Sequence, residues 1–186
     1  MNESTDLITL IKTRRTIHRY LDQQVAPEIV SEAIAAAHQA PNHKFTWPWR
    51  FTVVGPETKA MIDAAALAMK STNGPLEGRS LQVFKEKRVH PGLVVVSQVR
   101  VDDEFQAKED YAAVSCAVQN FCLAMRAHGI GTKWSTGSLI RNPRAYDLLQ
   151  IDDRAEEIVG FLWYGYPSST PDVTRPDVSV VRRDLP

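Results

Sequence analysis

Basic side chains gather near the beginning of the sequence, directly after a short apolar segment. The stretch RRTIHRY places four of them within six positions: Arg14, Arg15, His18 and Arg19. Two guanidinium groups beside a hydroxyl, here that of Thr16, form a donor set that suits a phosphate group. An arginine can also stabilise the C-terminal end of the helix before it. That second role accounts for one arginine better than for a cluster of four basic residues.

A second unusual stretch, APNHKFTWPWRF, combines aromatic rings and cations where a helical pattern gives way to a strand pattern. Trp49 and Phe51 are expected to belong to the hydrophobic core. His43 and Lys44 lie in a short polar run and are harder to explain by packing. Donors of this kind could bind a flat, anionic ligand, although a well-packed loop is an alternative.

The usual sequence motifs for nucleotide binding, nucleophilic catalysis and metal binding do not occur in the sequence. GIGTKWSTG has Trp134 where a dinucleotide fingerprint needs its third glycine, and it follows a helical rather than a strand pattern. Walker and G-x-S-x-G sequences are missing, and the five histidines lack metal-ligand spacing. If the protein is an enzyme, a bound cofactor is therefore expected to carry the reaction.

Composition favours one globular domain over residues 1–186. Hydrophobic residues make up 44% of the 186, and the formal net charge is zero, which argues against broad nucleic-acid binding. No segment has the pattern of a signal peptide or the length of a membrane span, so we expect a cytoplasmic protein. Cys116 and Cys122 fit no zinc motif and are expected to be small buried residues.

Hydrophobic periodicity predicts a mixture of helices and strands. Helices are expected over residues 6–13, from Pro27 to just before Pro41, and over 56–70, 79–88, 105–128 and 143–149. Strands are expected over residues 50–55, 92–99 and 156–166, with a short strand or turn after Gly129, which should cap the long helix. Residues 168–186 should form an extended tail. The pattern indicates an α+β layer fold rather than a doubly wound parallel sheet.

Four stretches in this order resemble the nitroreductase family of FMN-dependent oxidoreductases, in particular its compact, YdjA-like subgroup. They are RRTIHRY, APNHKFTWPWRF, GIGTKWSTG after the long helix, and IVGFLWYGYP. The resemblance covers nearly the whole chain. It implies an α+β sandwich with a mainly antiparallel central sheet flanked by helices, and an intertwined homodimer with FMN at the subunit interface. The tail from Ser168 would then lie across the partner.

The resemblance also implies which residues contact the cofactor. Residues 14–16 match the family's phosphate- and ribityl-binding element, residues 43–44 a loop that reaches the flavin of the second subunit, and residues 134–136 a segment along the flavin ring. Gln39 falls where the compact subgroup can have an arginine. The complete set is Arg14, Arg15, Thr16, Gln39, His43, Lys44, Trp134, Ser135 and Thr136. Trp47 departs from the family's Gln-Pro-Trp and would narrow the substrate pocket.

The implied activity is hydride transfer from NADH or NADPH through FMN to a nitro compound, quinone or similar small acceptor. Two alternatives share the fold: a different flavin reaction, such as flavin fragmentation, dehalogenation or ring oxidation, and a non-catalytic flavin-binding module. A small interaction domain without flavin is a further alternative. The sequence does not distinguish NADH from NADPH, because no site for the 2′-phosphate can be assigned.

Overall fold

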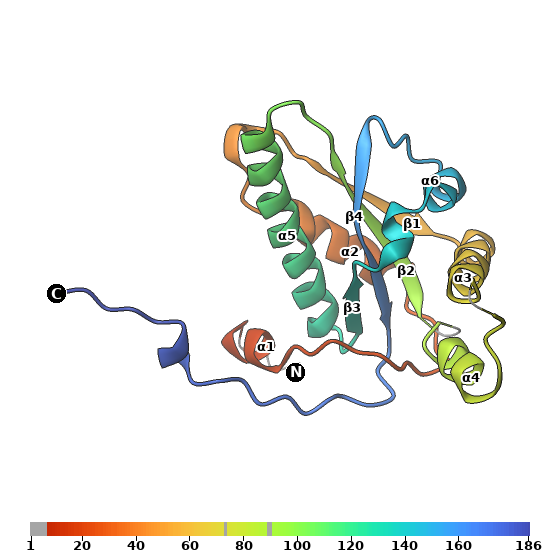
Figure 1. Cartoon of the computed structure of the whole chain (residues 1–186). Helices are drawn as coiled ribbons and strands as arrows, with labels where there is room; N and C mark the ends of the chain where they lie inside the picture. Colours follow the sequence, from red (N-terminus) through yellow and green to blue (C-terminus); the bar gives the residue numbers. More distant parts are fainter. Residues whose placement is uncertain (1–6, 73, 89–90) are drawn as a thin grey trace.

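Four antiparallel strands form the centre of the molecule, in the order β1–β2–β4–β3 (Figure 1). The computed structural model describes residues 7–72, 74–88 and 91–186. The strands are β1 (Trp49–Val54), β2 (Gly92–Val99), β3 (Gly131–Ser135) and β4 (Glu156–Gly165). The apolar run of β2 is buried on both sides because helices cover both faces of the sheet.

Two long helices cover one face of the sheet. They are α2 (Pro27–His38) and α5 (Glu104–Ala127), and they pack against each other as well as against the strands (Figure 1). The core on this side includes Val114, Phe121 and Met125 of α5, all fully buried. The long helix expected over residues 105–128 is thus confirmed.

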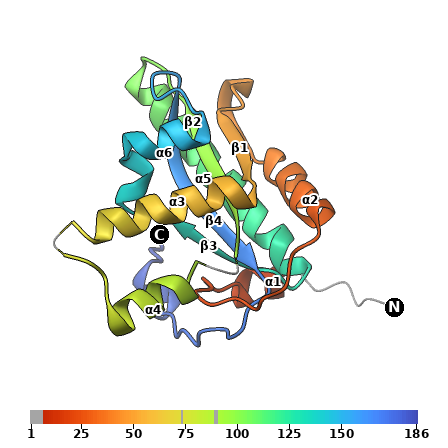
Figure 2. The ribbon, with the colours of Figure 1, turned by 90° about the vertical axis from the view of Figure 1, so that its right-hand side faces the viewer.

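Three further helices lie on the opposite side of the sheet (Figure 2). They are α3 (Pro56–Lys70), α4 (Gly78–Glu86) and α6 (Pro143–Leu149), and a 3-10 helix, η2 (Ser138–Arg141), precedes α6. Ile62 of α3 and Ala145 of α6 contribute to the second core cluster, with Phe161 and Trp163 of β4. α4 contributes no fully buried residue.

An extended segment near the N-terminus joins the edge of the sheet. After α1 (Leu7–Thr13), Thr16 forms a bridge with Thr132 of β3, and the amide of Ile17 donates to the carbonyl of Thr132 (2.9 Å). Gly131 has no room for a side chain, since a Cβ there would meet Ile17. The absence of a side chain at Gly131 thus allows the segment to lie directly against β3.

The chain from residue 168 onward leaves the body of the fold (Figure 1). Every residue of this tail is exposed, and its only helical turn is η3 (Val178–Val180). The exposed tail carries apolar side chains, among them Val173, Val178, Val180, Val181 and Leu185. Within the single chain these side chains are not covered.

The predicted elements agree with the structure to within one or two residues where they can be compared. Asp6, placed in the first predicted helix, lies outside the described residues. Gly129 has a φ of 74° after α5, as a C-capping glycine requires. The expectation for the cysteines was wrong for one of them: Cys122 is buried but Cys116 is exposed. Two side chains that are six residues apart on a helix point in different directions, so Cys116 faces away from the core that contains Cys122. No helix among the described residues is long and apolar enough to cross a membrane.

Candidate ligand-binding site at the edge of the sheet

A cavity of about 880 Å³ opens between α3, α4 and the strands β3 and β4. Its apolar wall includes Val83, Phe84 and Trp163. A smaller cavity of about 180 Å³ adjoins it, shares Lys70, Arg88 and Trp163, and extends to Ser135 at the end of β3. Cavities of several hundred cubic ångströms with an apolar wall are typical of sites for small molecules and cofactors.

The larger cavity is strongly basic, although the whole chain is neutral. Its lining contains one acidic residue, Glu77, against five basic ones: Lys70, Arg79, Lys87, Arg88 and Lys133. Arg88 is paired with Asp63. The other four, which we call the cation cluster, make no ion pair or side-chain hydrogen bond within the described part of the chain. We infer from this excess of positive charge that the cavity suits an anionic ligand.

Lys133 is the member of the cation cluster that the fold buries most. It lies on β3 opposite Trp163 of β4, and its pKa is lowered, chiefly by burial. Positive neighbours lower the pKa further: Arg88, Lys87 and Lys70. The pKa of His18 is lowered as well, first by burial and then by the charges of Lys133 and Lys87. An anion at this place would favour the charged form of both groups.

A hydroxyl at the end of β3 also lacks a partner. The Oγ of Ser135 is buried and makes no hydrogen bond to any residue that the structure describes. Because buried polar groups are almost always hydrogen-bonded, such an atom beside a cavity suits contact with a ligand or a bound water. Ser135 and Lys133 project from the same face of β3, as the alternation of a strand requires.

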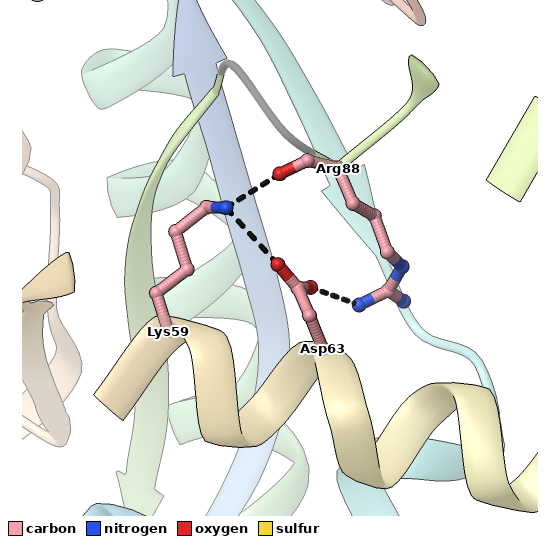
Figure 3. Close-up of polar contacts among 3 residues, drawn as sticks. All are labelled: Lys59, Asp63 and Arg88. Atoms are coloured by element: carbon pink, nitrogen blue, oxygen red, sulfur yellow. Dashed lines mark hydrogen bonds and ion pairs between the residues drawn. The ribbon is translucent and has the colours of Figure 1, made fainter. Parts of the chain in front are cut away.

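An ion-pair network holds Arg88, which lines the cavity (Figure 3). Lys59 and Asp63 lie one turn apart on α3, with Nζ of Lys59 3.0 Å from Oδ2 of Asp63. Lys59 also donates to the backbone carbonyl of Arg88 (2.5 Å), while Nη1 of Arg88 donates to Oδ1 of Asp63 (2.8 Å). The guanidinium carbon of Arg88 lies 4.8 Å from the ring centre of Trp163 and 5.0 Å from that of Phe84. The network holds the guanidinium of Arg88 over the aromatic wall.

The residues of the predicted phosphate-binding element lie at the β3 edge of the sheet, but Arg14 and Arg15 have different partners. Arg14 lies near Cys122 of α5 and Thr132, where its charge opposes the rise that burial causes in the pKa of the thiol. Arg15 instead donates from Nη1 to the carbonyls of Lys12 and Arg14 (2.7 and 2.9 Å). In the single chain, Arg15 therefore serves the end of α1, and Arg14 is the better candidate for a ligand contact.

His43 and Lys44 lie in a strained, outward-facing loop at the opposite end of α5. The loop includes the 3-10 helix η1 (His43–Phe45), and Lys44, Phe45 and Trp47 have φ values of 57°, 54° and 42°. Such values are uncommon for residues other than glycine and cost conformational energy. His43, Lys44, Phe45 and Trp47 are all exposed.

Asn42 and Asp110 hold this strained loop in place. The amide nitrogen of Asn42 donates to Oγ1 of Thr46 (2.8 Å), and the amide of Trp47 donates to Oδ1 of Asn42 (2.7 Å). Oγ1 of Thr46 in turn donates to the buried carboxylate of Asp110 (2.6 Å). Asp110 and Cys122, which mark the two ends, are separated by about 18 Å along α5. One chain thus keeps residues 43–44 apart from residues 14–16.

The remaining predicted residues are divided between the two faces of the sheet. Trp134 packs against the core on the α5 side, and its Nε1 donates to the carbonyl of Val159 (3.4 Å). It therefore does not line the cavity that contains Ser135, while Thr136 and Gln39 are exposed. Sequence analysis missed most of the cavity's basic residues. Their local signal, the KEKR run at residues 85–88, has no motif around it, and the fold alone brings it to β3.

Comparison with known proteins identifies the class of protein to which this fold and site belong. The sequence profile described as "Nitroreductase family" matches residues 11–166. The chain belongs to the nitroreductase family, and it is an oxidoreductase of that class.

Named relatives extend over nearly the whole chain. The chain is 30% identical over 179 residues to "Putative NAD(P)H nitroreductase YfhC" of Bacillus subtilis, and the alignment covers 94% of this chain and 91% of the relative. It is 25% identical over 166 residues to "Putative NAD(P)H nitroreductase YdjA" of Escherichia coli K12, over 87% of this chain and 88% of the relative. The resemblance noted from the sequence is thereby confirmed.

Solved structures agree on the fold. A nitroreductase-like family protein from Bacillus cereus superposes with a TM-score of 0.84 at 27% identity, covering 100% of this chain and 98% of that one. A nitroreductase-like protein from Desulfovibrio desulfuricans, solved in complex with FMN, gives a TM-score of 0.75 at 22% identity and covers 99% of both chains. The expected α+β sandwich with an antiparallel central sheet is confirmed.

Proposed function

We propose that the protein binds FMN and uses NADH or NADPH to reduce a nitro compound, a quinone or a similar small acceptor. Family membership supports a reductase, and the names of the relatives YfhC and YdjA refer to NAD(P)H nitroreduction. The Desulfovibrio structure with the same fold was solved with FMN bound. The cofactor would accept a hydride from the nicotinamide and deliver it to the acceptor.

The observation that carries this proposal is the basic cavity beside β3. Lys133 of its cation cluster lacks a carboxylate partner within the described residues, and the buried Ser135 hydroxyl on the same strand lacks a hydrogen bond. A flavin offers carbonyl and ring-nitrogen acceptors to these two donors, and its phosphate offers negative charge to Arg14 at the β3 edge. The apolar wall around Trp163 suits the flat ring. The residues present therefore fit FMN.

The chain's own residues would then divide the binding as follows. Arg14 and Thr16 hold the phosphate at the β3 edge, and Lys133 and Ser135 donate hydrogen bonds to the ring. Trp134 supports β3 from the other face of the sheet, and the apolar wall keeps water from the ring. Among the described residues no group of three metal-ligand side chains occurs, and no residue is required to act as a nucleophile.

We further propose that the complete site needs two copies of the chain. His43 and Lys44 lie far from Arg14 within one chain, yet they occupy a loop that strain and hydrogen bonds hold in one conformation. The tail beyond residue 168 exposes valines that its own chain does not cover. A homodimer in which each loop reaches the partner's flavin, and each tail lies on the partner, would use both features.

Spectroscopy of the purified protein tests the proposal. Yellow protein with bound FMN is expected, and NADH or NADPH should bleach it anaerobically without an acceptor. A quinone or nitroaromatic should then restore the colour, and double-reciprocal plots should be parallel if the two substrates use one site in turn. A colourless protein that takes up no FMN would refute the cofactor. Bound FMN that neither nicotinamide bleaches would refute the reductase and favour another flavin reaction or a binding module.

A further inference from the structure

The cation cluster carries more positive charge than one flavin needs. Its members come from three separate elements: Lys70 ends α3, Arg79 begins and Lys87 follows α4, and Lys133 lies on β3. Lys70, Arg79 and Lys87 are exposed, so each could be a solvated surface residue when taken alone. The fold nevertheless directs all of them to one cavity and supplies a single acidic residue, Glu77, in its lining.

The charge of FMN does not account for this cluster. Its single phosphate is assigned above to Arg14 and Thr16, which lie beside Thr132 and do not line the cavity. The ring of oxidised flavin is uncharged, and two donors, Lys133 and Ser135, serve it. Lys70 and Arg79 therefore remain available for a second negative group.

The shape of the cavity indicates what carries that group. Its volume of about 880 Å³ exceeds what a flavin ring alone would fill, and its apolar wall is built from Val83, Phe84 and Trp163. Arg88 does not compete for the ligand's charge, since Asp63 already binds it. The cavity thus offers a flat apolar wall close to free cations, which suits an aromatic ligand with an acidic substituent.

We propose that the cation cluster, chiefly Lys70 and Arg79, selects a second ligand that carries a carboxylate or phosphate next to its reacting ring. The proposal rests on the flavin reductase function proposed above and adds the substrate class to it. The shared chemistry, an anionic group on a flat ligand, has two sources. It belongs either to an acidic aromatic acceptor or to the additional phosphate that distinguishes NADPH from NADH.

Matched ligands separate these sources. For the acceptor, 4-nitrobenzoate is compared with the uncharged 4-nitrobenzamide, and for the donor, NADPH is compared with NADH. The protein variants are the double substitution Lys70→Gln/Arg79→Gln and the control Arg144→Gln, which removes an exposed cation of α6 outside the cavity. A charge-assisted contact contributes enough for a preference of about tenfold or more in kcat/KM.

In at least one of the two ligand pairs, the wild-type protein should have a higher kcat/KM for the more negatively charged ligand, which is 4-nitrobenzoate or NADPH. Higher salt concentration should reduce this preference. The double variant should lose about tenfold of it, mainly through a higher KM, while its FMN affinity and the rates with uncharged ligands stay within about twofold. Arg144→Gln should behave as wild type. Equal rates within both pairs, or a double variant that loses FMN and no preference, would overturn the proposal.

Binding without turnover keeps this test apart from the proposed function. Calorimetric titration of oxidised, flavin-loaded protein with 4-nitrobenzoate and with NADP⁺ should give at least one affinity that the double variant weakens. If the protein takes up no FMN, the reductase function fails, and the same titrations on the flavin-free chain still test the cluster. Absence of any difference between wild type and double variant in these titrations would overturn anion selection.

Discussion

Arg88 donates a hydrogen bond of 2.8 Å from Nη1 to Oδ1 of Asp63, which ties the segment after α4 to α3. Both side chains are about one-fifth exposed, so water screens the pair only in part. The same carboxylate binds Lys59, and the guanidinium covers Trp163. The wall of the cavity therefore depends on one acidic residue of α3.

Substituting Asp63→Asn should destabilise the protein and loosen this wall. Arg88 and Lys59 would keep their charges without a carboxylate between them, at a cost of about 1–3 kcal/mol in the free energy of unfolding. Urea denaturation measures the change. Asp102→Asn, an exposed carboxylate between β2 and α5, is the control and should stay within about 0.5 kcal/mol. Equal effects of the two substitutions would show that the network stabilises nothing.

Arg14→Ala and Arg15→Ala form a matched pair, because the two arginines are adjacent but have different partners. Arg14→Ala should weaken FMN by about ten- to a hundredfold, as expected for a lost contact to a charged group. Arg15→Ala should weaken FMN less and instead lower thermal stability, since its guanidinium binds carbonyls at the end of α1. Equilibrium dialysis and circular dichroism measure the two effects, and the reverse order would assign the phosphate to Arg15.

Gly131→Ala should displace the segment that carries Arg14 and Thr16. The new methyl group would meet Ile17, which is buried and cannot turn away, so we expect a loss of about 1–3 kcal/mol in stability. FMN affinity should fall as well, because the segment moves away from β3. Gly137→Ala is the control, as nothing lies within 4 Å of a Cβ there and its φ is −70°. Similar thermal melts for both variants would contradict the close approach.

His18 should report the charge of the cavity. Its pKa is lowered, so below its ordinary value of 6.5 the unfolded chain takes up the proton before the folded one. Folding stability should therefore fall as pH decreases through 6.5 toward the folded pKa, and His18→Gln should flatten this dependence. Inorganic phosphate or 4-nitrobenzoate bound in the cavity should raise the pKa of His18, measured by NMR titration. An unchanged pKa would mean that the anion binds elsewhere.

Mixed dimers should test whether the site is shared between two chains. If Arg14 and His43 of different subunits meet one flavin, a heterodimer of Arg14→Ala and His43→Ala has one intact site and one doubly damaged site. Differently tagged chains, purified together, should then bind one FMN per dimer with wild-type affinity. Each variant homodimer should bind weakly at both sites. Two equally weakened sites in the heterodimer would show instead that each chain builds its own.

The secondary structure was predictable because its signals are local. Pro27, Pro56 and Pro143 begin helices at fixed positions, Asn142 caps one by accepting from the amide of Arg144, and Gly129 ends another. The strands followed from their β-branched runs. The family resemblance implied that Arg14 and Ser135 contact the flavin, which stays a prediction.

The cation cluster could not be predicted in the same way, because its residues are distant in sequence and each looks like an ordinary surface residue. Lys133 is the one member within a recognised motif, and the fold brings residues of α4 to the same cavity from elsewhere in the chain. The left-handed conformation of Phe45 and Trp47 was equally hidden, since aromatic residues rarely adopt it. The loop that contains them is tied to α5 by the hydrogen bond from Thr46 to Asp110, which lies 64 residues further along the chain.

The pairing of residues 16–21 with the far end of the chain has a consequence for how the protein is made. Thr16 bridges to Thr132, and Leu21 and Ser168 exchange backbone hydrogen bonds with Tyr166 and Arg19 across the same junction. A segment that leaves the ribosome first must wait, unpaired, until β3 and β4 have been synthesised, and contacts so distant in sequence form slowly. The flavin pocket should accordingly be among the last parts of the fold to form. FMN could then bind only to chains whose synthesis is nearly complete.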